Sequence, residues 1–314
     1  MDRPTRPGHT VTDSPGGPSV ALRTLITERQ RRLGAELKKL RLQAGLSIAD
    51  GGKLIGMGAP HLSHIEAGRT AIPADRLRQL VDAYGCKNAP YVDALVSMAE
   101  SSGKGWWSDY KGRLWPSALD LAELESDAAE LHSYESLFIP GLFQTEDYTA
   151  SIFRADDEAN TPDHVTAAVS FRMQRQAILH GERPPAIHAV IHEAALHMRF
   201  GGAKVMRKQL LRLIELADLP HVSLQILPFT AEGVSTLSTP FVILTSHGQA
   251  LETVLMETPG QSLFLHDEPS IAKYQRQFHR LGSGALPPVD ATVAPFAHDS
   301  RDSLGLIQHV LYTL

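Results

Sequence analysis

The side chains whose types and spacing could do chemistry are gathered in residues 45–69. Histidine and serine side chains in this segment can hydrogen-bond to base edges, and an alanine followed by a proline can contact a thymine methyl group. An arginine at the end of the segment carries a charge suited to a phosphate. Together these groups predict a surface that contacts a DNA duplex. The residues concerned are Ser47, Gly58, Ala59, Pro60, His61, Ser63, His64 and Arg69.

Two short helices joined by a tight turn would present those side chains. Ser47 is placed to cap the first helix, with Asp50 three residues later in the manner of a capping box. Gly56 supplies the turn, and a second helix is expected over 59–66, where Pro60 is tolerated in the first turn. This is the layout of a DNA-binding helix-turn-helix. The inward positions are Ile48, Gly52, Ile55, Leu62 and Ile65.

The flanking sequence and its charge favour DNA binding. Amphipathic helices are expected before and after the hairpin, in a bundle of about five helices. Residues 20–84 hold 11 Lys or Arg against 6 Asp or Glu, whereas the whole chain has a net charge of −5. A basic region on an acidic protein is what phosphate binding requires. Candidate phosphate contacts are Lys38, Lys39, Arg69, Arg76 and Arg78.

At these residues the chain resembles the Xre-type (lambda-repressor-like) helix-turn-helix family. The matching positions are Leu40-Arg41, Gly45-Leu46-Ser47, Ile55-Gly56, residues 62–66 and Gly68-Arg69. The resemblance implies a bidentate salt bridge from Arg41 to Glu66, which would hold the first helix of the bundle against the third. Two departures leave a degenerate domain without DNA binding as the alternative. Ile48 stands where the family has Gln, and Gly51 where it has Leu.

Composition places the chain among two-domain cytoplasmic proteins. It has 314 residues, 43% of them hydrophobic, and no apolar run long enough to cross a membrane. Residues 1–18 are expected to be a disordered tail rather than a signal peptide, because they lack an apolar segment. The single cysteine, Cys86, excludes an internal disulfide and is interpreted as a small structural hydrophobe.

Beyond a linker at 101–105, the pattern indicates an α+β domain with a mainly antiparallel sheet. Helices are expected over 119–134, 163–179, 205–217, 269–281 and 302–314, and strands over 186–191, 222–227, 241–245, 253–256 and 262–265. The predicted organisation is a multi-domain chain with an all-α helix-turn-helix domain at 20–100 and an α+β effector or protein-interaction domain at 105–285. A Pro-rich spacer and a C-terminal helix follow at 286–314.

Sequence blocks in the second domain extend the resemblance over residues 25–282. They include 105–110, 140–148, 172–176, 192–196, 205–210 and 222–229. These blocks are similar to those of actinobacterial regulators in which an Xre-type domain precedes an antitoxin-like domain of uncharacterised function. The resemblance implies transcriptional regulation, with a small partner protein encoded nearby, and supplies neither a ligand nor a reaction.

Four residues of the second domain invite a zinc-site interpretation, namely His188, His192, Glu193 and His197. Zinc-binding helices place two histidines four residues apart, whereas His192 and His197 are five apart and diverge by about 140°. On a strand, His188 and His192 would share a face, but two ligands do not make a site. No metal, cofactor or catalytic residue is therefore expected, and we expect that the protein is not an enzyme.

An aromatic cluster with polar neighbours predicts a ligand pocket in the second domain. Stacked rings with a few polar groups can fix a small molecule. The alternative is that the two tryptophans pack the linker onto the second domain. The residues are Trp106, Trp107, Tyr110, Tyr134, Glu135, Gln144, Tyr148 and Arg175.

These features together predict a cytoplasmic transcriptional regulator that binds double-stranded DNA as a homodimer. Its second domain would sense a small-molecule effector or a protein partner, and no membrane association is expected. The alternative is an antitoxin-like protein-interaction module whose helix-turn-helix does not read DNA.

Overall fold

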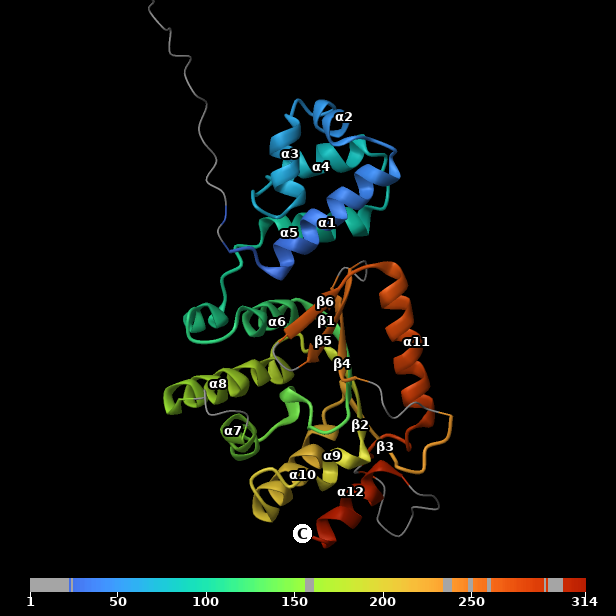
Figure 1. Cartoon of the computed structure of the whole chain (residues 1–314). Helices are drawn as coiled ribbons and strands as arrows, with labels where there is room; N and C mark the ends of the chain where they lie inside the picture. Colours follow the sequence, from blue (N-terminus) through green and yellow to red (C-terminus); the bar gives the residue numbers. More distant parts are fainter. Residues whose placement is uncertain are drawn as a thin grey trace, which may run out of the picture.

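The computed structural model describes residues 23, 25–155, 161–233, 239–247, 251–258, 261–290, 292 and 302–314. The tail expected over residues 1–18 lies outside this set. A helical domain is followed along the chain by a larger domain built on one sheet, as Figure 1 shows. No helix in the described ranges combines the length and the apolar character needed to cross a membrane.

The helical domain confirms the predicted bundle around the hairpin. Four of its helices contribute fully buried leucines from their apolar faces to one core. These are Leu37, Leu62, Leu77, Leu80 and Leu95. The part of this domain that the structure describes has the helices α1 (Glu28–Gln43), α2 (Ile48–Lys53), α3 (Ala59–Glu66), α4 (Ala74–Ala83) and α5 (Ala89–Glu100).

Gly34 allows α1 to lie directly against the last turn of α3. A Cβ atom at this position would lie 2.3 Å from the carbonyl oxygen of Glu66 and 2.9 Å from that of Ile65. Both are backbone atoms, which cannot rotate out of the way. The close approach of the two helices therefore requires a glycine here.

The linker is packed onto the second domain through its tryptophans. Trp107 is 8% exposed and lies in a cluster with Leu114, Ala122 and Phe171, and the Trp106 ring centroid is 5.0 Å from that of Phe171. These rings belong to η1 (Trp106–Tyr110) and to helices of the second domain. Of the two interpretations of Trp106 and Trp107, this packing is that of an interdomain anchor.

The second domain contains a six-stranded mixed sheet with strand order β3-β2-β1-β4-β5-β6. The pairs β1–β2 and β2–β3 are parallel, and the pairs β1–β4, β4–β5 and β5–β6 are antiparallel. The mainly antiparallel α+β prediction is thereby confirmed. The strands are β1 (Ala128–Glu135), β2 (Ala186–His192), β3 (Val222–Leu227), β4 (Phe241–Ser246), β5 (Glu252–Thr258) and β6 (Gln261–Leu265).

The central strand β1 was missed by the sequence prediction. Residues 119–134, expected to form one helix, are divided between a helix that ends at Ser126 and a strand that begins at Ala128. The strand sequence Ala-Ala-Glu-Leu-His-Ser has ordinary helix formers, but β1 pairs with β2 on one side and with β4 on the other. Pairing along both edges of the strand overrides the local helix preference.

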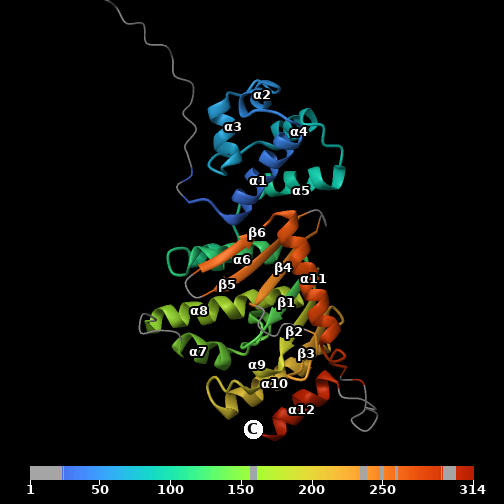
Figure 2. The same cartoon turned by 45° about the vertical axis from the view of Figure 1, so that its right-hand side comes forward.

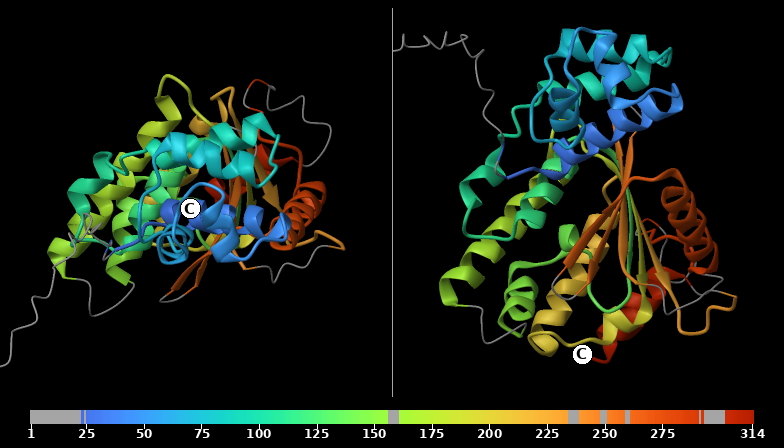
Figure 3. Two further views of the ribbon diagram at one scale, coloured as in Figure 1. Left: turned by 90° about the horizontal axis from the view of Figure 1, so that it is seen from above. Right: turned by 45° about the horizontal axis from the view of Figure 1, so that its top comes forward.

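Helices cover both faces of the sheet (Figure 3). Helices α7, α8 and α10 lie on one side, and α11 lies on the other, where Tyr274, Phe278 and Leu281 pack against the sheet. The helices predicted over 163–179, 205–217, 269–281 and 302–314 are confirmed. The remaining elements are α6 (Pro116–Ser126), η2 (Gly141–Phe143), α7 (Glu146–Ala155), α8 (Pro162–Arg175), η3 (Gln176–His180), α9 (Glu193–His197), α10 (Ala203–Ala217), α11 (Glu268–Gly284) and α12 (Ser303–Tyr312).

The C-terminal helix α12 belongs to the second domain. Leu304, Ile307 and Val310 are each at most 4% exposed and lie in the same core cluster as α10 and the sheet. The Ser303 hydroxyl accepts a hydrogen bond from the backbone N–H of Ile226 on β3 at 2.9 Å. Helix α12, together with Val289, therefore completes the core of this domain.

Charged side chains at the N-terminal half of α1 join the two domains. The backbone N–H of Glu28 donates to Asp120 Oδ1 at 3.1 Å, and Arg31 Nη2 lies 3.3 Å from the same carboxylate. Arg29 forms an ion pair with Glu123. Asp120 and Glu123 lie on α6, so α1 is bonded directly to the second domain, as its position in Figures 1 and 2 indicates.

We predict that Gly34→Ala destabilises the protein although alanine is the better helix former. The propensity gain of about 1 kcal/mol is outweighed by overpacking against α3, for a net loss on the order of 1–2 kcal/mol. Gly282→Ala on α11 is the matched control, because its Cβ would lie no closer than 3.6 Å to any neighbour. Thermal unfolding should show a lower midpoint for Gly34→Ala alone. Equal midpoints for the two variants would contradict the close helix approach.

Candidate functional site

The hairpin that was expected to contact DNA has the predicted geometry. Ser47 caps α2, and its hydroxyl accepts a hydrogen bond from the backbone N–H of Asp50 at 3.1 Å. The Asp50 carboxylate accepts a hydrogen bond from the Ser47 hydroxyl and not from the Ser47 backbone N–H, so the cap is formed without the full capping box. Gly56 has φ +66° in the turn, a conformation that favours glycine.

The outer face of α3 is open. Leu62 and Ile65 are at most 2% exposed in the core, whereas Ser63 is exposed and His61 and His64 are partly exposed. Gly58 and Pro60 are exposed and Ala59 is partly so. Figures 1 and 2 show α3 on a side of the helical domain that the second domain does not cover. A duplex can therefore reach all six positions that were predicted to contact bases.

The expected salt bridge between Arg41 and Glu66 is present and bidentate. Arg41 Nε donates to Glu66 Oε1 at 2.7 Å and Nη2 donates to Oε2 at 2.9 Å, while Nη1 donates to the carbonyl of Leu46 at 2.7 Å. The two side chains are 7% and 5% exposed. Hydrogen bonding to Glu66 raises the pKa of Arg41. This pair holds the end of α3 against α1.

Gly51, which departs from the Xre pattern, makes room for that bridge. A Cβ atom at Gly51 would lie 2.7 Å from Arg41 Cδ and 2.8 Å from the Tyr84 hydroxyl oxygen. Gly52 lies against the carbonyl of Met57, 2.4 Å from where its Cβ would be. A side chain at either glycine would therefore clash with neighbouring atoms of the hairpin.

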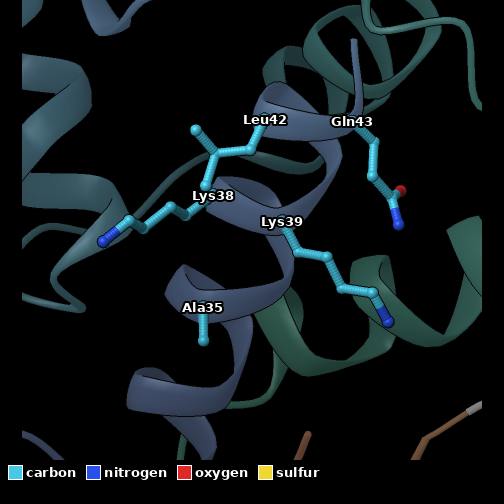
Figure 4. A pocket seen from close by; sticks show the side chains of 5 residues that line it. All are labelled: Ala35, Lys38, Lys39, Leu42 and Gln43. Atoms are coloured by element: carbon cyan, nitrogen blue, oxygen red, sulfur yellow. The ribbon is translucent and has the colours of Figure 1, made fainter. Parts of the chain in front are cut away.

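The basic residues predicted to contact phosphates are distributed over several elements. Lys38 and Lys39 are exposed, and Figure 4 shows their side chains diverging from neighbouring positions on α1. Lys39 lies 4.0 Å from Glu36. Arg69 is exposed just after α3. Arg76 donates to the carbonyl of Ile55 at 2.8 Å, and Arg78 pairs with Asp93 at 3.0 Å.

A cavity of about 490 Å³ lies in the second domain between the sheet and helices α6 to α8. Its wall contains Glu135, Gln144 and Arg175 from the predicted pocket, together with groups that sequence reasoning missed. These additional groups are Glu125, Arg172, Glu257 and the side chains of Phe138, Phe143, Phe153 and Phe200. The spacing of Arg172 and Arg175, three residues apart on one face of a helix, could have indicated the arginines.

Five of the eight predicted pocket residues lie elsewhere. Trp106, Trp107 and Tyr110 pack against α6 and α8 in a separate cluster, because η1 anchors the linker there. Tyr134 is next to Glu135 on β1 and therefore points to the opposite face of the sheet, where α11 lies. Tyr148 is fully buried in the core, and its hydroxyl accepts a hydrogen bond from Ile139 N–H at 3.2 Å.

Charges inside the cavity are only partly paired. Arg175 forms a bidentate pair with Glu125, at 2.8 Å from Nε and 2.6 Å from Nη2. Arg172 Nη1 donates to Gln144 Oε1 at 2.9 Å. Burial and the neighbouring Arg175 lower the pKa of Arg172 to about 10. Burial and repulsion from Glu257 raise the pKa of Glu135 to about 8. Such perturbed groups in a cavity mark a candidate binding site.

The histidines considered for zinc have structural partners. His188 Nε2 lies 2.6 Å from Gln225 Oε1, and the His192 Nδ1 accepts the backbone N–H of Ala194 at 3.1 Å as the cap of α9. His197 lies 3.8 Å from Glu193. Within the described ranges, no three His, Cys, Asp or Glu side chains are grouped so that they could hold a metal ion.

Helix α6 connects the cavity with the helical domain. Glu125, in its last turn, lines the cavity and binds Arg175. Asp120 and Glu123 of the same helix bind Glu28, Arg31 and Arg29 of α1. Helix α1 in turn carries Arg41, which binds α3. Three separate ion pairs, linked by helices α6 and α1, therefore lie between the cavity wall and α3.

Two family models match the chain. A family described as a domain of unknown function (DUF5753) matches residues 118–294, and one described as a helix-turn-helix domain matches residues 32–94. The first match includes α6, the whole sheet and the cavity, and the second includes α2 and α3. No curated protein and no solved structure matches the chain.

We predict that Glu135→Gln stabilises the protein at alkaline pH. An unfolded Glu ionises near its ordinary pKa, whereas the folded one stays protonated up to about pH 8, so stability is lost as pH rises between these values. The free energy of unfolding falls by at most about 1.4 kcal/mol per pH unit in this range, and Glu135→Gln removes this pH dependence. The melting midpoints of Glu135→Gln and of the unsubstituted protein should differ most near pH 8 and become equal near pH 4.

Glu182→Gln, at an exposed loop position, is the control for this prediction. Its midpoint should follow that of the unsubstituted protein at every pH. A constant difference between Glu135→Gln and the unsubstituted protein from pH 4 to pH 8 would contradict the interior position of Glu135.

Proposed function

The chain belongs to the DUF5753 family and has a helix-turn-helix domain before that region, and from this we propose that it is a sequence-specific DNA-binding transcriptional regulator. The observation that carries the proposal is the open outer face of α3 on a hairpin fixed by Arg41 and Glu66. In this proposal two copies of the chain bind paired half-sites in the cytoplasm. The Xre type and the antitoxin-like group stay predictions.

The second domain is proposed to bind an effector and to change DNA affinity. The cavity and the DNA-facing helix are joined through α6 and α1, which supports this coupling. A ligand that binds one arrangement of the two domains better changes DNA affinity by that difference in binding free energy and by no more. An effector in the cavity would lie beside Arg175, which is bonded to Glu125 of α6.

Base readout in this proposal is limited to a few polar groups. Ser63, His61 and His64 can hydrogen-bond to base edges, and Ala59 and Pro60 supply apolar contact. No arginine or glutamine stands on the outer face of α3 between residues 59 and 66. The shape of the duplex therefore contributes to the choice of site.

We predict that Arg69→Ala weakens binding to all duplexes alike. Loss of one phosphate contact should reduce the slope of log affinity against log salt by about 1. The measurement is a salt series with duplexes taken from upstream of the protein's own gene. Arg280→Ala is the matched control, since Arg280 is exposed near the end of α11 in the second domain. Equal slopes for Arg69→Ala and Arg280→Ala would contradict the role of Arg69.

His64→Ala is expected to change sequence preference rather than overall affinity. Removing a base-edge contact should cost about 1–3 kcal/mol at the preferred site and little at random duplexes. Selection of bound duplexes from a random pool measures this effect. Retention of the unsubstituted protein only at very low salt, with no selected sequence, would instead favour the antitoxin-like interaction module.

A further inference from the structure

The cavity lies where the order of strands in the sheet reverses. Strands β2 and β3 lie on one side of β1, and β4, β5 and β6 lie on the other. Glu135 is the last residue of β1, and the segment that follows it, residues 138–144, forms one wall of the cavity. The volume of about 490 Å³ suits a small molecule.

One positive charge in the cavity has no carboxylate partner. The Arg172 guanidinium donates to the neutral Gln144 side chain and lies 5.0 Å from the centre of the Phe153 ring. Within the described part of the chain no carboxylate lies within 4.0 Å of it, whereas the neighbouring Arg175 is fully matched by Glu125. A guanidinium has five N–H donors. Most of those of Arg172 are therefore left for an anionic group.

Two carboxyl groups in the same cavity also lack a cation. Glu135 on β1, which is partly buried, and Glu257 on β5, which is exposed, both line it, and among the described residues neither makes a hydrogen bond or an ion pair. The two groups repel each other, which favours the neutral form of Glu135. A cationic group placed between them would remove this repulsion.

We propose that the cavity binds a small zwitterion of the amino-acid class, with its carboxylate on Arg172, its ammonium group at Glu135 and Glu257, and its apolar body against Phe138, Phe143 and Phe200. This inference rests on the proposed effector response and names the chemical class of the effector. A simple carboxylic acid would leave the two glutamates unmatched, and a simple amine would leave Arg172 unmatched. Unmatched buried charges and donors reduce affinity.

Binding of an ammonium group should release a proton from Glu135. The groups that act on this carboxyl are Glu257 on β5 and Arg172 on α8, and Tyr148 on α7 is near enough for Glu135 to raise its pKa. Arg175 and Glu125 line the same cavity and are paired with each other. Its pKa of about 8 means that it is mostly protonated near pH 7 in the empty cavity. An adjacent cation lowers that pKa, so the proton leaves to buffer. The heat of binding then depends on the ionisation enthalpy of the buffer.

The test is isothermal titration calorimetry of the full chain without DNA, in two buffers of different ionisation enthalpy. The probes are L-phenylalanine and L-leucine, with 3-phenylpropionate lacking the amine and phenethylamine lacking the carboxylate. At least one amino acid should bind, and each truncated analogue of phenylalanine should bind at least about tenfold more weakly than phenylalanine. Glu135→Gln should abolish the proton release.

Arg172→Gln should remove binding of both L-phenylalanine and 3-phenylpropionate. Arg183→Gln, at an exposed loop position, is its matched control and should bind like the unsubstituted protein. Circular dichroism and melting midpoints show that each variant is folded. Should Arg172→Gln fail to fold, the ratio between phenylalanine and its two analogues in the unsubstituted protein decides the matter.

Absence of heat with every probe at millimolar concentration would overturn the inference. So would equal binding of L-phenylalanine and 3-phenylpropionate. Duplex retention measured on the same preparations separates this inference from the proposed function. Salt-dependent DNA binding without amino-acid binding would reject only the zwitterion, and amino-acid binding without DNA binding would reject only the DNA-reading role.

Discussion

The ion pair between Arg41 and Glu66 is the interaction on which the helical domain depends. It holds α1 against α3 with two hydrogen bonds that are almost completely shielded from water. A buried pair of this kind is costly to break, because either partner alone would be an uncompensated interior charge. The same contact explains why two positions are glycine. A side chain at Gly34 would push α1 away from α3, and a side chain at Gly51 would displace the Arg41 side chain.

Helix α1 is fixed at both ends by charge, and this gives the two domains a physical connection. Its C-terminal half holds the DNA-facing helix, and its N-terminal half is bonded to Asp120 and Glu123 of α6. Burial raises the pKa of Asp120 to about 6, as expected for a carboxyl removed from water. Helix α6 also supplies Glu125 to the cavity wall, so in the proposed function it is the element through which the cavity would act on α1.

The cavity differs from the rest of the interior in the way its charges are matched. Arg41 in the helical domain and Arg175 in the cavity wall each have a bidentate carboxylate partner, whereas Arg172 has none among the described residues. Arg172 and Glu135 lie close enough to influence each other's pKa without forming an ion pair. In the proposed complex a bound dipolar molecule would join them, with its carboxylate at Arg172 and its ammonium group at Glu135.

Local patterns in the sequence were sufficient for the helix-turn-helix. The cap at Ser47, the turn at Gly56 and the apolar spacing of α3 all involve neighbours in the chain, so they can be inferred from spacing. The Arg41–Glu66 pair joins residues 25 apart and was expected from the family resemblance alone. Most helices and five of the strands followed from periodicity for the same reason. Strand β1 and the cavity were decided only by the tertiary structure. Residues 128–135 become a strand through pairing with β2 and β4, which lie far away in sequence. That pairing turns Glu135 toward Arg172 and Glu257, and turns Tyr134 away. No local signal contains the register of a central strand, because the register is set by the partners on both of its edges.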